Sequence, residues 1–251
     1  MEYTITSRKN PGILHVKRLG SDRDYRRESG EFVCFGKKLL QEALANGAEI
    51  RAVFRAPGEA EGMCPAGVPE YLVPEDVLAS SSPFRTSPGV LFTCAIPEEG
   101  EKTLTGGEVI LETVQDPGNV GTVLRTANAF GVPAVVLIGD CADIYNPKAV
   151  RASMGAVFRE KVVSMTLEDL QSASNRVRIL GAALGEGCTD VRRTDLSGAA
   201  VAIGSEGHGL SPELLELCRG RIRIPMRPEC ESLNAAAAAA VILWEMRREL
   251  L

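Results

Sequence analysis

Short apolar runs alternate with helical patterns through the second half of the chain, and this alternation constrains the fold more than any other feature. Runs rich in Val, Ile and Ala predict strands at residues 108–114, 134–139, 178–184, 199–204 and 221–226. Apolar residues at helical spacing predict helices at residues 119–130, 147–156, 167–174, 211–218 and 232–250. Such alternation favours a mostly parallel sheet covered on both faces, so we predict an α/β fold.

The first hundred residues predict a separate and smaller α/β domain. Its expected elements are strands at residues 32–35, 50–54 and 89–96, a helix between Gly36 and Gly47 and a short helix at residues 74–80. The stretch PEEGEKTLTGG that follows is acidic and glycine-rich, has no apolar period and is typical of a linker. We therefore divide the chain into a first domain at 1–97, a linker at 98–107 and a second domain at 108–251.

The formal charge of −5 gives no global basic signature, so a nucleic-acid partner would require a local patch. The first forty residues supply one, with nine basic residues against five acidic residues. Such a patch is either a nucleic-acid contact or a solvated helix face, and we favour RNA contact only if the second domain also acts on RNA. The nine basic residues are Arg8, Lys9, Lys17, Arg18, Arg23, Arg26, Arg27, Lys37 and Lys38.

The cysteines and the apolar runs bear on metal, compartment and membrane. Seven scattered cysteines form no CxxC pair and there are only two histidines, so we expect no metal site and no disulfide framework. Free cysteines are typical of a reducing cytoplasm, where we place the protein. The polar N-terminus does not resemble a signal peptide, and the apolar stretch 235–244 is too short to span a bilayer.

The first segment with chemical potential is QDPGNVGTVLRTANAFG at residues 115–131. Asp116-Pro117-Gly118 predicts a turn after a strand, and Asn119 is then the expected N-cap of the next helix. Arg125 lies further along that helix, where its planar fork can hold a phosphate. On this segment alone, a capping asparagine and a solvated arginine are the simpler interpretation.

The second segment is AIGSEGHGLSPE at residues 202–213, a glycine-rich loop after an apolar strand. Gly204, Gly207 and Gly209 allow a ligand to approach the backbone closely. The pattern is neither a Walker A loop nor GxGxxG, and the alternative is a tight turn before a helix capped by Ser211. Glu206 can accept a hydrogen bond from a ligand hydroxyl or from a neighbouring chain.

The third segment, residues 221–245, runs from a strand through IPM and ESLN into an alanine-rich helix. An ordinary N-cap is the simplest role for Ser232. The helix is apolar nearly all round through Leu243, so we expect it to be buried, in part against another subunit.

Together the three segments resemble the three motifs of the SpoU/TrmH family of RNA 2′-O-ribose methyltransferases, in the SPOUT superfamily. The similarity in order and spacing covers residues 108–251 and includes NPKAVRASMGAVF at residues 146–158. Ser205 replaces the asparagine of many members. Residues 5–44 resemble the opening of an L30e-like RNA-binding domain, although Phe35 stands where that domain commonly has a glutamate.

The resemblance implies a fold, a cofactor and a set of site residues. The fold would contain a C-terminal trefoil knot, an exception to the rule that chains do not knot. The protein would form a homodimer through the knotted domain. The cofactor would be S-adenosylmethionine, and the residues that would bind it are Ile203, Gly204, Ile224, Met226 and Leu233. The catalytic group would comprise Arg125, Asn119, Glu206, Ser232 and Asn234.

Three functions remain open at this point. The L30e-like domain favours ribosomal RNA as the substrate, with tRNA as the alternative. A non-catalytic RNA-binding factor in ribosome assembly is a second alternative, which the intact set of catalytic residues disfavours. A mononucleotide-binding module has only the glycine loop in its favour. The sequence therefore predicts a ribose 2′-O-methyltransferase that acts on ribosomal RNA.

Overall fold

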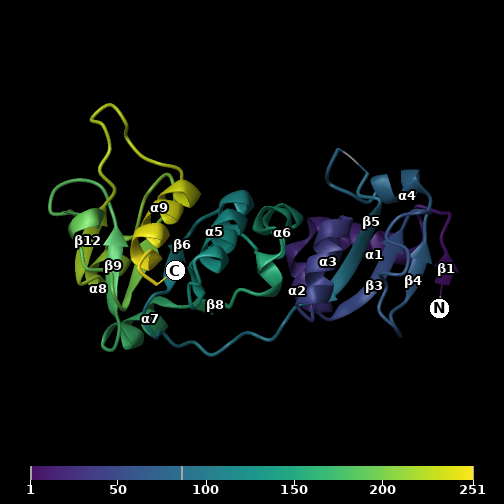
Figure 1. Cartoon of the computed structure of the whole chain (residues 1–251), viewed down its shortest axis with the longest axis horizontal. Coiled ribbons are helices and arrows are strands. Elements are labelled where there is room, and N and C mark those ends of the chain that lie inside the picture. Colours follow the sequence, from purple (N-terminus) through teal and green to yellow (C-terminus); the bar gives the residue numbers. More distant parts are fainter. Residues whose placement is uncertain (1, 86, 251) are drawn as a thin grey trace. The chain divides into compact units, whose positions relative to one another are not determined.

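The computed structural model describes residues 2–85 and 87–250, which form two compact units (Figure 1). The first unit comprises Met1–Glu98 and Asp143–Phe158, and the second unit comprises Glu99–Ala142 and Arg159–Leu251. Among the described residues, no helix is both long enough and apolar enough to cross a membrane. All seven cysteines are free thiols.

The first unit is built on a mixed five-stranded sheet in the order β1-β4-β3-β5-β2. Its strands are β1 (Glu2–Thr4), β2 (Glu31–Phe35), β3 (Ile50–Arg55), β4 (Glu70–Leu72) and β5 (Val90–Ala95). Its helices before residue 98 are α1 (Pro11–Ser21), α2 (Arg23–Ser29), α3 (Lys37–Ala45) and α4 (Glu75–Ala79). Alternate residues of β2 enter different cores, since Phe32 packs with Leu40 of α3 whereas Val33 packs with Ile13 of α1. The sheet is therefore covered on both faces.

The predicted elements of this unit are observed, and the missed ones are α1, α2, β1 and β4. A signal for α1 was present in the sequence, because Asn10 caps the helix and Pro11 occupies its first turn. Strands β1 and β4 have only three residues each, too few for a period-2 pattern to be recognised.

A segment from the second half of the sequence completes the first unit. It carries α6 (Pro147–Ser153) and η1 (Ala156–Phe158), whose residues Val150 and Val157 are buried in the α3-side core. Arg26 is 2% exposed and its Nη2 lies 2.6 Å from Oδ2 of Asp143. Arg26 also donates to the Leu19 carbonyl. The charge of Arg26 is thus neutralised inside the protein, so the prediction that this residue contributes to an RNA-binding surface was wrong.

The second unit contains a seven-stranded sheet in which every recorded strand pair is parallel, which confirms the predicted α/β class. Its order is β10-β12-β9-β11-β6-β7-β8. The strands are β6 (Val109–Glu112), β7 (Val135–Ile138), β8 (Val162–Met165), β9 (Arg178–Ala182), β10 (Thr189–Asp190), β11 (Ala199–Ile203) and β12 (Gly220–Arg223). Sequence reasoning missed β8 and β10, which are short and form the two edges of the sheet.

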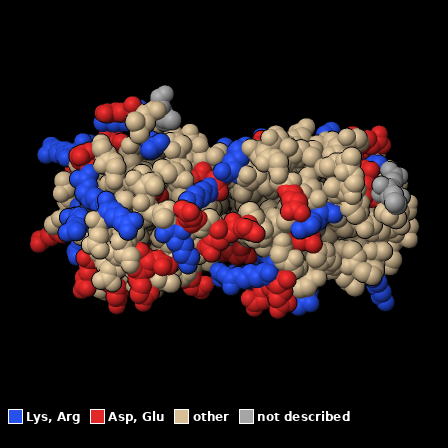
Figure 2. All heavy atoms as spheres, turned by 90° about the horizontal axis from the view of Figure 1, so that it is seen from below, with Lys and Arg blue, Asp and Glu red and all other residues tan. Residues whose placement is uncertain are grey.

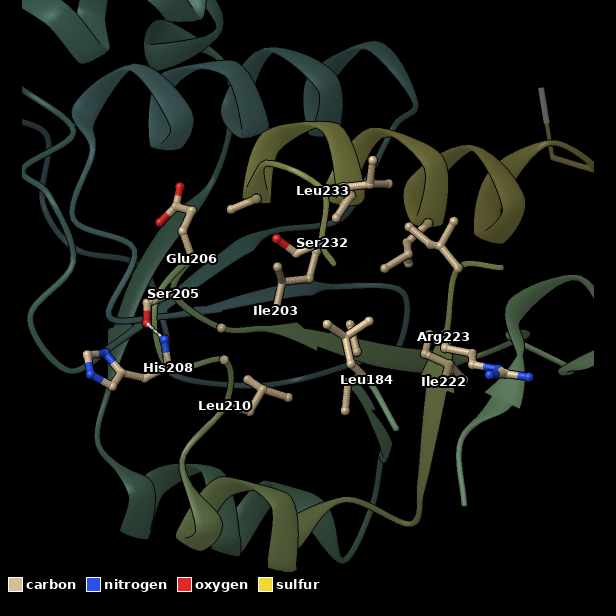
Figure 3. Close-up of a pocket in the computed structure, with 18 of the residues that line it drawn as sticks. Leu184, Ile203, Ser205, Glu206, His208, Leu210, Ile222, Arg223, Ser232 and Leu233 are labelled. Atoms are coloured by element: carbon tan, nitrogen blue, oxygen red, sulfur yellow. Dashed lines mark hydrogen bonds between the residues drawn. The ribbon is translucent and has the colours of Figure 1, made fainter. Parts of the chain in front are cut away.

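Helices cover both faces of this sheet (Figure 3). They are α5 (Pro117–Ala129), α7 (Leu167–Ser174), α8 (Pro212–Leu217) and α9 (Ala235–Arg247), with a 3₁₀ turn η2 (Val191–Arg193). Leu170 of α7 and Leu214 of α8 pack in one core with strand residues such as Ile110, while α5 and α9 pack together on the other face. Helix α9 is buried along one side only, because Val241 is 42% and Trp244 is 51% exposed.

The strand order places a reversal at the centre of the sheet. From β6 the chain continues outward through β7 and β8, then returns to form β9, and β11 later fills the place between β9 and β6. Ligands in open α/β sheets bind beyond the carboxyl ends of the strands at such a reversal. The carboxyl ends of β6 and β11 carry the first and second predicted motifs.

Candidate active site

A pocket of about 450 Å³ lies beyond the carboxyl ends of β9, β11 and β12. Its walls come from the end of β9, the glycine loop after β11, the segment after β12 and the start of α9 (Figure 3). The lining residues include all five predicted cofactor residues, which are Ile203, Gly204, Ile224, Met226 and Leu233. A mostly aliphatic pocket of this size suits a small organic ligand.

The glycine loop is a tight hairpin. The Ser205 and Gly209 backbones exchange two hydrogen bonds, with N···O distances of 3.2 and 2.9 Å. A Cβ atom on Gly204 would lie 2.0 Å from the carbonyl carbon of Gly209. Sequence reasoning attributed this glycine to close approach of a ligand, but the group in closest approach is the chain's own backbone. Gly204 is therefore required for the loop to close.

Glu112 fixes the far end of this loop, and sequence reasoning missed it. The residue ends β6 and is 6% exposed. Its carboxylate accepts hydrogen bonds from the Ser211 backbone N–H at 2.7 Å and from the Ser211 hydroxyl at 2.5 Å. The Ser211 hydroxyl oxygen also accepts from the Leu214 N–H, which confirms Ser211 as the N-cap of α8. A glutamate inside the apolar run EVILETV was the available signal.

Three of the predicted catalytic residues meet in one hydrogen-bonded chain. The Asn119 side-chain amide donates to Oε1 of Glu206, and the Asn234 amide donates to Oδ1 of Asn119 at 3.0 Å. Oδ1 of Asn234 accepts from the backbone N–H of Ala236 at 3.0 Å. This chain, which we call the amide–carboxylate network, joins the starts of α5 and α9 to the glycine loop.

Two predicted helix caps were wrong, and both corrections explain the network. Asp116, not Asn119, caps α5, because its carboxylate accepts from the Asn119 N–H at 3.0 Å and Pro117 begins the helix. Asn234, not Ser232, caps α9. The Asn119 side chain is thereby left to join Glu206 and Asn234, and Ser232 lines the pocket instead.

Arg125 stands apart from these residues. It lies six residues after Asn119, about 9 Å further along α5 at 1.5 Å per residue. The side chain is exposed, is not part of the pocket lining, and forms no hydrogen bond or ion pair with any described residue. A guanidinium with five unused donors can receive a phosphate or a developing oxyanion.

Solved structures share this architecture along the whole chain. An AdoMet-bound rRNA methyltransferase from Sinorhizobium meliloti has a TM-score of 0.90 and 28% identity, covering 100% of this chain and 99% of that one. The SpoU methyltransferase AviRb from Streptomyces viridochromogenes, in complex with AdoMet, has a TM-score of 0.84 and 26% identity, covering 96% and 98%. The fold and the pocket thus define a methyltransferase of the SPOUT class.

Sequence comparison specifies the family within that class. The model of the SpoU rRNA Methylase family matches residues 107–244. The 23S rRNA (guanosine(2553)-2′-O)-methyltransferase RlmP of Bacillus subtilis is 32% identical, over 97% of this chain and 98% of the relative. The chain belongs to the SpoU rRNA methylase family, which confirms the resemblance identified from the motifs.

Proposed function

We propose that the protein transfers a methyl group from S-adenosylmethionine to a ribose 2′-hydroxyl of ribosomal RNA. The observation that carries this proposal is the amide–carboxylate network at the rim of an apolar pocket. The network joins residues of all three motifs and lies beside a cavity of the size that a small organic donor needs. The AdoMet-bound neighbours and the rRNA methyltransferase relative support the same chemistry.

The residues that line the pocket fit this donor. Aliphatic side chains such as Leu184, Ile224 and Leu233 can enclose a flat adenine ring, and the strand-end backbone can read its polar edge. Glu206 also lines the pocket, and its negatively charged carboxylate would attract a positively charged ligand. When bound, S-adenosylmethionine supplies a methyl group that is already activated by a positively charged sulfur, so the protein must mainly align the two reactants.

The remaining residues would act on the RNA. A guanidinium holds its proton too tightly to serve as a base at rest, so we assign Arg125 to the RNA phosphate and to the negative charge that develops on the 2′-oxygen. Asn119 and Asn234, held together by their hydrogen bond, would position the nucleotide. Ser232 lies exposed at the pocket wall, where its hydroxyl can contact the same nucleotide.

The first unit would hold the RNA as an L30e-like domain, with residues 1–97 as its sequence core. Lys and Arg side chains are interspersed with Asp and Glu on the face seen in Figure 2, so contact would depend on local groups of cations. Arg8 and Arg18 are already paired with Asp76 and Asp22. The basic residues that remain most available near the N-terminus are Lys9, Arg27, Lys37 and Lys38, all exposed.

The proposal extends to the assembly and the chain path. Exposed Val241 and Trp244 on α9 supply the apolar surface for a homodimer through the second unit. A trefoil knot around the segment that follows β12, and a cytoplasmic location, belong to the same proposal. Light scattering at micromolar concentration tests the dimer, since a monomeric mass contradicts it.

The test of function is methyl transfer to naked 23S rRNA and to bulk tRNA with isotopically labelled S-adenosylmethionine, followed by mapping of 2′-O-methyl positions. We expect one ribose in 23S rRNA to be labelled. Label in tRNA alone would reassign the substrate. Donor binding without transfer to either RNA would favour a non-catalytic assembly factor.

A further inference from the structure

Three side chains from separate segments of the first unit are stacked together. The rings of Phe35, at the end of β2, and Phe84, in the loop after α4, lie edge to face with centroids 5.5 Å apart. The guanidinium carbon of Arg151, in the last turn of α6, lies 4.5 Å from the Phe84 ring centroid. We call these three residues the aromatic–arginine stack.

The stack is held in place by the surrounding structure. Phe35 packs against the α1-side core, and the Phe84 N–H donates to the Ser82 hydroxyl at 3.1 Å. The backbone of the Phe84 loop follows Ser81, which is buried and donates its hydroxyl hydrogen to the Val77 carbonyl. The guanidinium therefore lies over a ring that is held in place, which removes much of the entropic cost of ordering it.

Arg151 has no polar partner despite this order. The side chain is exposed and forms no hydrogen bond or ion pair with any described residue. Arg51, another exposed arginine of the same unit, does have a partner, since its Nη1 lies 2.9 Å from Oε1 of Glu49. A cation that is stacked on one face and unpaired at its edges is available to a planar, anionic ligand.

The residues next to the stack are also unpaired cations. Lys37 and Lys38 follow Phe35 by two and three positions, and Arg85 follows Phe84 directly. All three are exposed, and none forms an ion pair with another of the described residues. With Arg151, four cations thus belong to the stack or lie within three residues of it in sequence, although the whole chain carries a net charge of −5.

We propose that the aromatic–arginine stack binds an unpaired nucleotide of the RNA substrate, with the base stacked on the Arg151 guanidinium and the flanking phosphates held by the neighbouring lysines. Only an unstacked base exposes the face that such a platform needs, so the occupant is single-stranded RNA and not a duplex. The inference rests on the proposed function for its ligand class. It also gives a role to Phe35, which departs from the glutamate common in L30e-like domains.

The test measures binding of the full-length protein to a short unpaired oligoadenylate that contains one 2-aminopurine, whose fluorescence falls when it stacks. For Arg151→Leu and Phe84→Leu we expect binding weaker by about tenfold or more and loss of the fluorescence change. Arg51→Leu, which removes the same charge from a paired arginine of the same unit, should bind like the wild type. Melting curves establish that each variant is folded, and Arg151→Lys provides a surface variant that keeps the charge.

The salt dependence separates stacking from simple charge attraction. Phe84→Leu should leave the slope of log K against log salt unchanged, whereas Arg151→Leu should reduce it by about 0.7. Wild-type affinity and fluorescence in Arg151→Lys, or an equal loss in Arg51→Leu, would overturn the proposal. If the wild type fails to methylate rRNA but the Phe84→Leu difference persists, the proposed function fails and the platform stands. If rRNA is methylated and the stack variants bind the oligonucleotide normally, the proposed function stands and the proposed role of the aromatic–arginine stack fails.

Discussion

The two halves of the candidate active site are built in opposite ways. The proposed donor side is an apolar pocket whose glycine loop closes on itself through backbone hydrogen bonds and is tied to β6 through Glu112. The proposed RNA side is exposed and polar, and its Arg125 side chain forms no hydrogen bond or ion pair with any described residue. A small ligand needs a preformed cavity, whereas contacts to an RNA backbone are completed by the RNA itself.

Two carboxylates below the surface repeat this contrast. Glu112 on the donor side has both oxygens engaged by Ser211. Glu160 lies beside Asn128, which is one turn beyond Arg125 on α5, and its buried Oε1 has no hydrogen-bond partner among the described residues. Burial raises the pKa of Glu160 to about 7. Both oxygens of Glu112 thus have partners, whereas Oε1 of Glu160 has none among the described residues.

The largest expected effect tests whether Arg125 is independent of the donor pocket, as the contrast between the two sides requires. We expect Arg125→Ala to lower single-turnover methyl transfer by roughly 10²–10³-fold, because it removes the group that holds phosphate and stabilises the 2′-oxyanion. Donor affinity, measured by calorimetry, should remain within about twofold, since Arg125 does not line the pocket.

Arg125→Lys should restore little of this loss, because a point charge does not reproduce a bidentate fork. Near-normal turnover in the alanine variant would show that another group stabilises the oxyanion. A parallel loss of donor affinity would place Arg125 in the cofactor site or in the fold, and the division into two halves would fail.

The next largest effect should come from the donor side. In Gly204→Ala the new methyl group meets the Gly209 backbone at 2.0 Å, so the loop must open. We expect donor affinity to fall by about 1–3 kcal/mol, the usual cost of overpacking, which is roughly 5- to 150-fold. Gly207→Ala is the control, because its Cβ would meet nothing within 4 Å. Equal affinities in the two variants would contradict the role assigned to loop closure.

The donor side was predictable from sequence because its signals are local. The five residues that the family resemblance assigned to the donor all line the pocket, and the motifs that carry this resemblance are continuous stretches of sequence. The error concerned the reason for Gly204. The sequence does not reveal that the loop folds back on itself, since that depends on the backbone pairing of Ser205 with Gly209.

The RNA side was less predictable because its contacts are long-range. Asn119, Glu206 and Asn234 were selected by resemblance, but their mutual hydrogen bonds span 87 and 115 residues. Local reasoning gave Asn119 a capping role that Asp116 performs. The same limit applies to residues 143–158. Periodicity predicts the helix in this segment, but it does not reveal that the apolar side chains pack in the core of the first unit.

Asn234 has two roles, because its side chain caps α9 and also donates to Asn119 in the amide–carboxylate network. Asn234→Ala should cost about 1 kcal/mol of stability through the lost cap of α9. It should also slow methyl transfer by about tenfold through the lost bond to Asn119. Asn234→Asp separates the two effects, since aspartate caps equally well but cannot donate to Asn119. If the aspartate variant has wild-type rate, the network has no part in the reaction.

The smallest expected effect concerns the free energy of unfolding and the buried carboxylate of Glu160. The pKa of Glu160 is raised from 4.5 to about 7, mainly by burial, so the folded state disfavours the charged form. This penalty is absent below pH 4.5, grows as the pH rises toward 7 and is complete above it. Glu160→Gln should therefore stabilise the protein at pH 8 and have little effect near pH 4.5. Allowing for solvent screening at a partly exposed group, we expect about 1 kcal/mol, or about 2–4 °C in melting temperature.

Glu112→Gln is the matched control for this substitution and should act in the opposite direction. A glutamine can keep the bond from the Ser211 backbone N–H through its one oxygen, but its NH2 group then faces the Ser211 hydroxyl, whose hydrogen loses its acceptor. The expected cost is about 1–3 kcal/mol. Thermal melting of both variants at pH 5 and pH 8 measures the difference directly. If Glu160→Gln instead lowers the stability at pH 8, the Glu160 carboxylate has a partner in solution. The contrast between Glu160 and Glu112 would then fail.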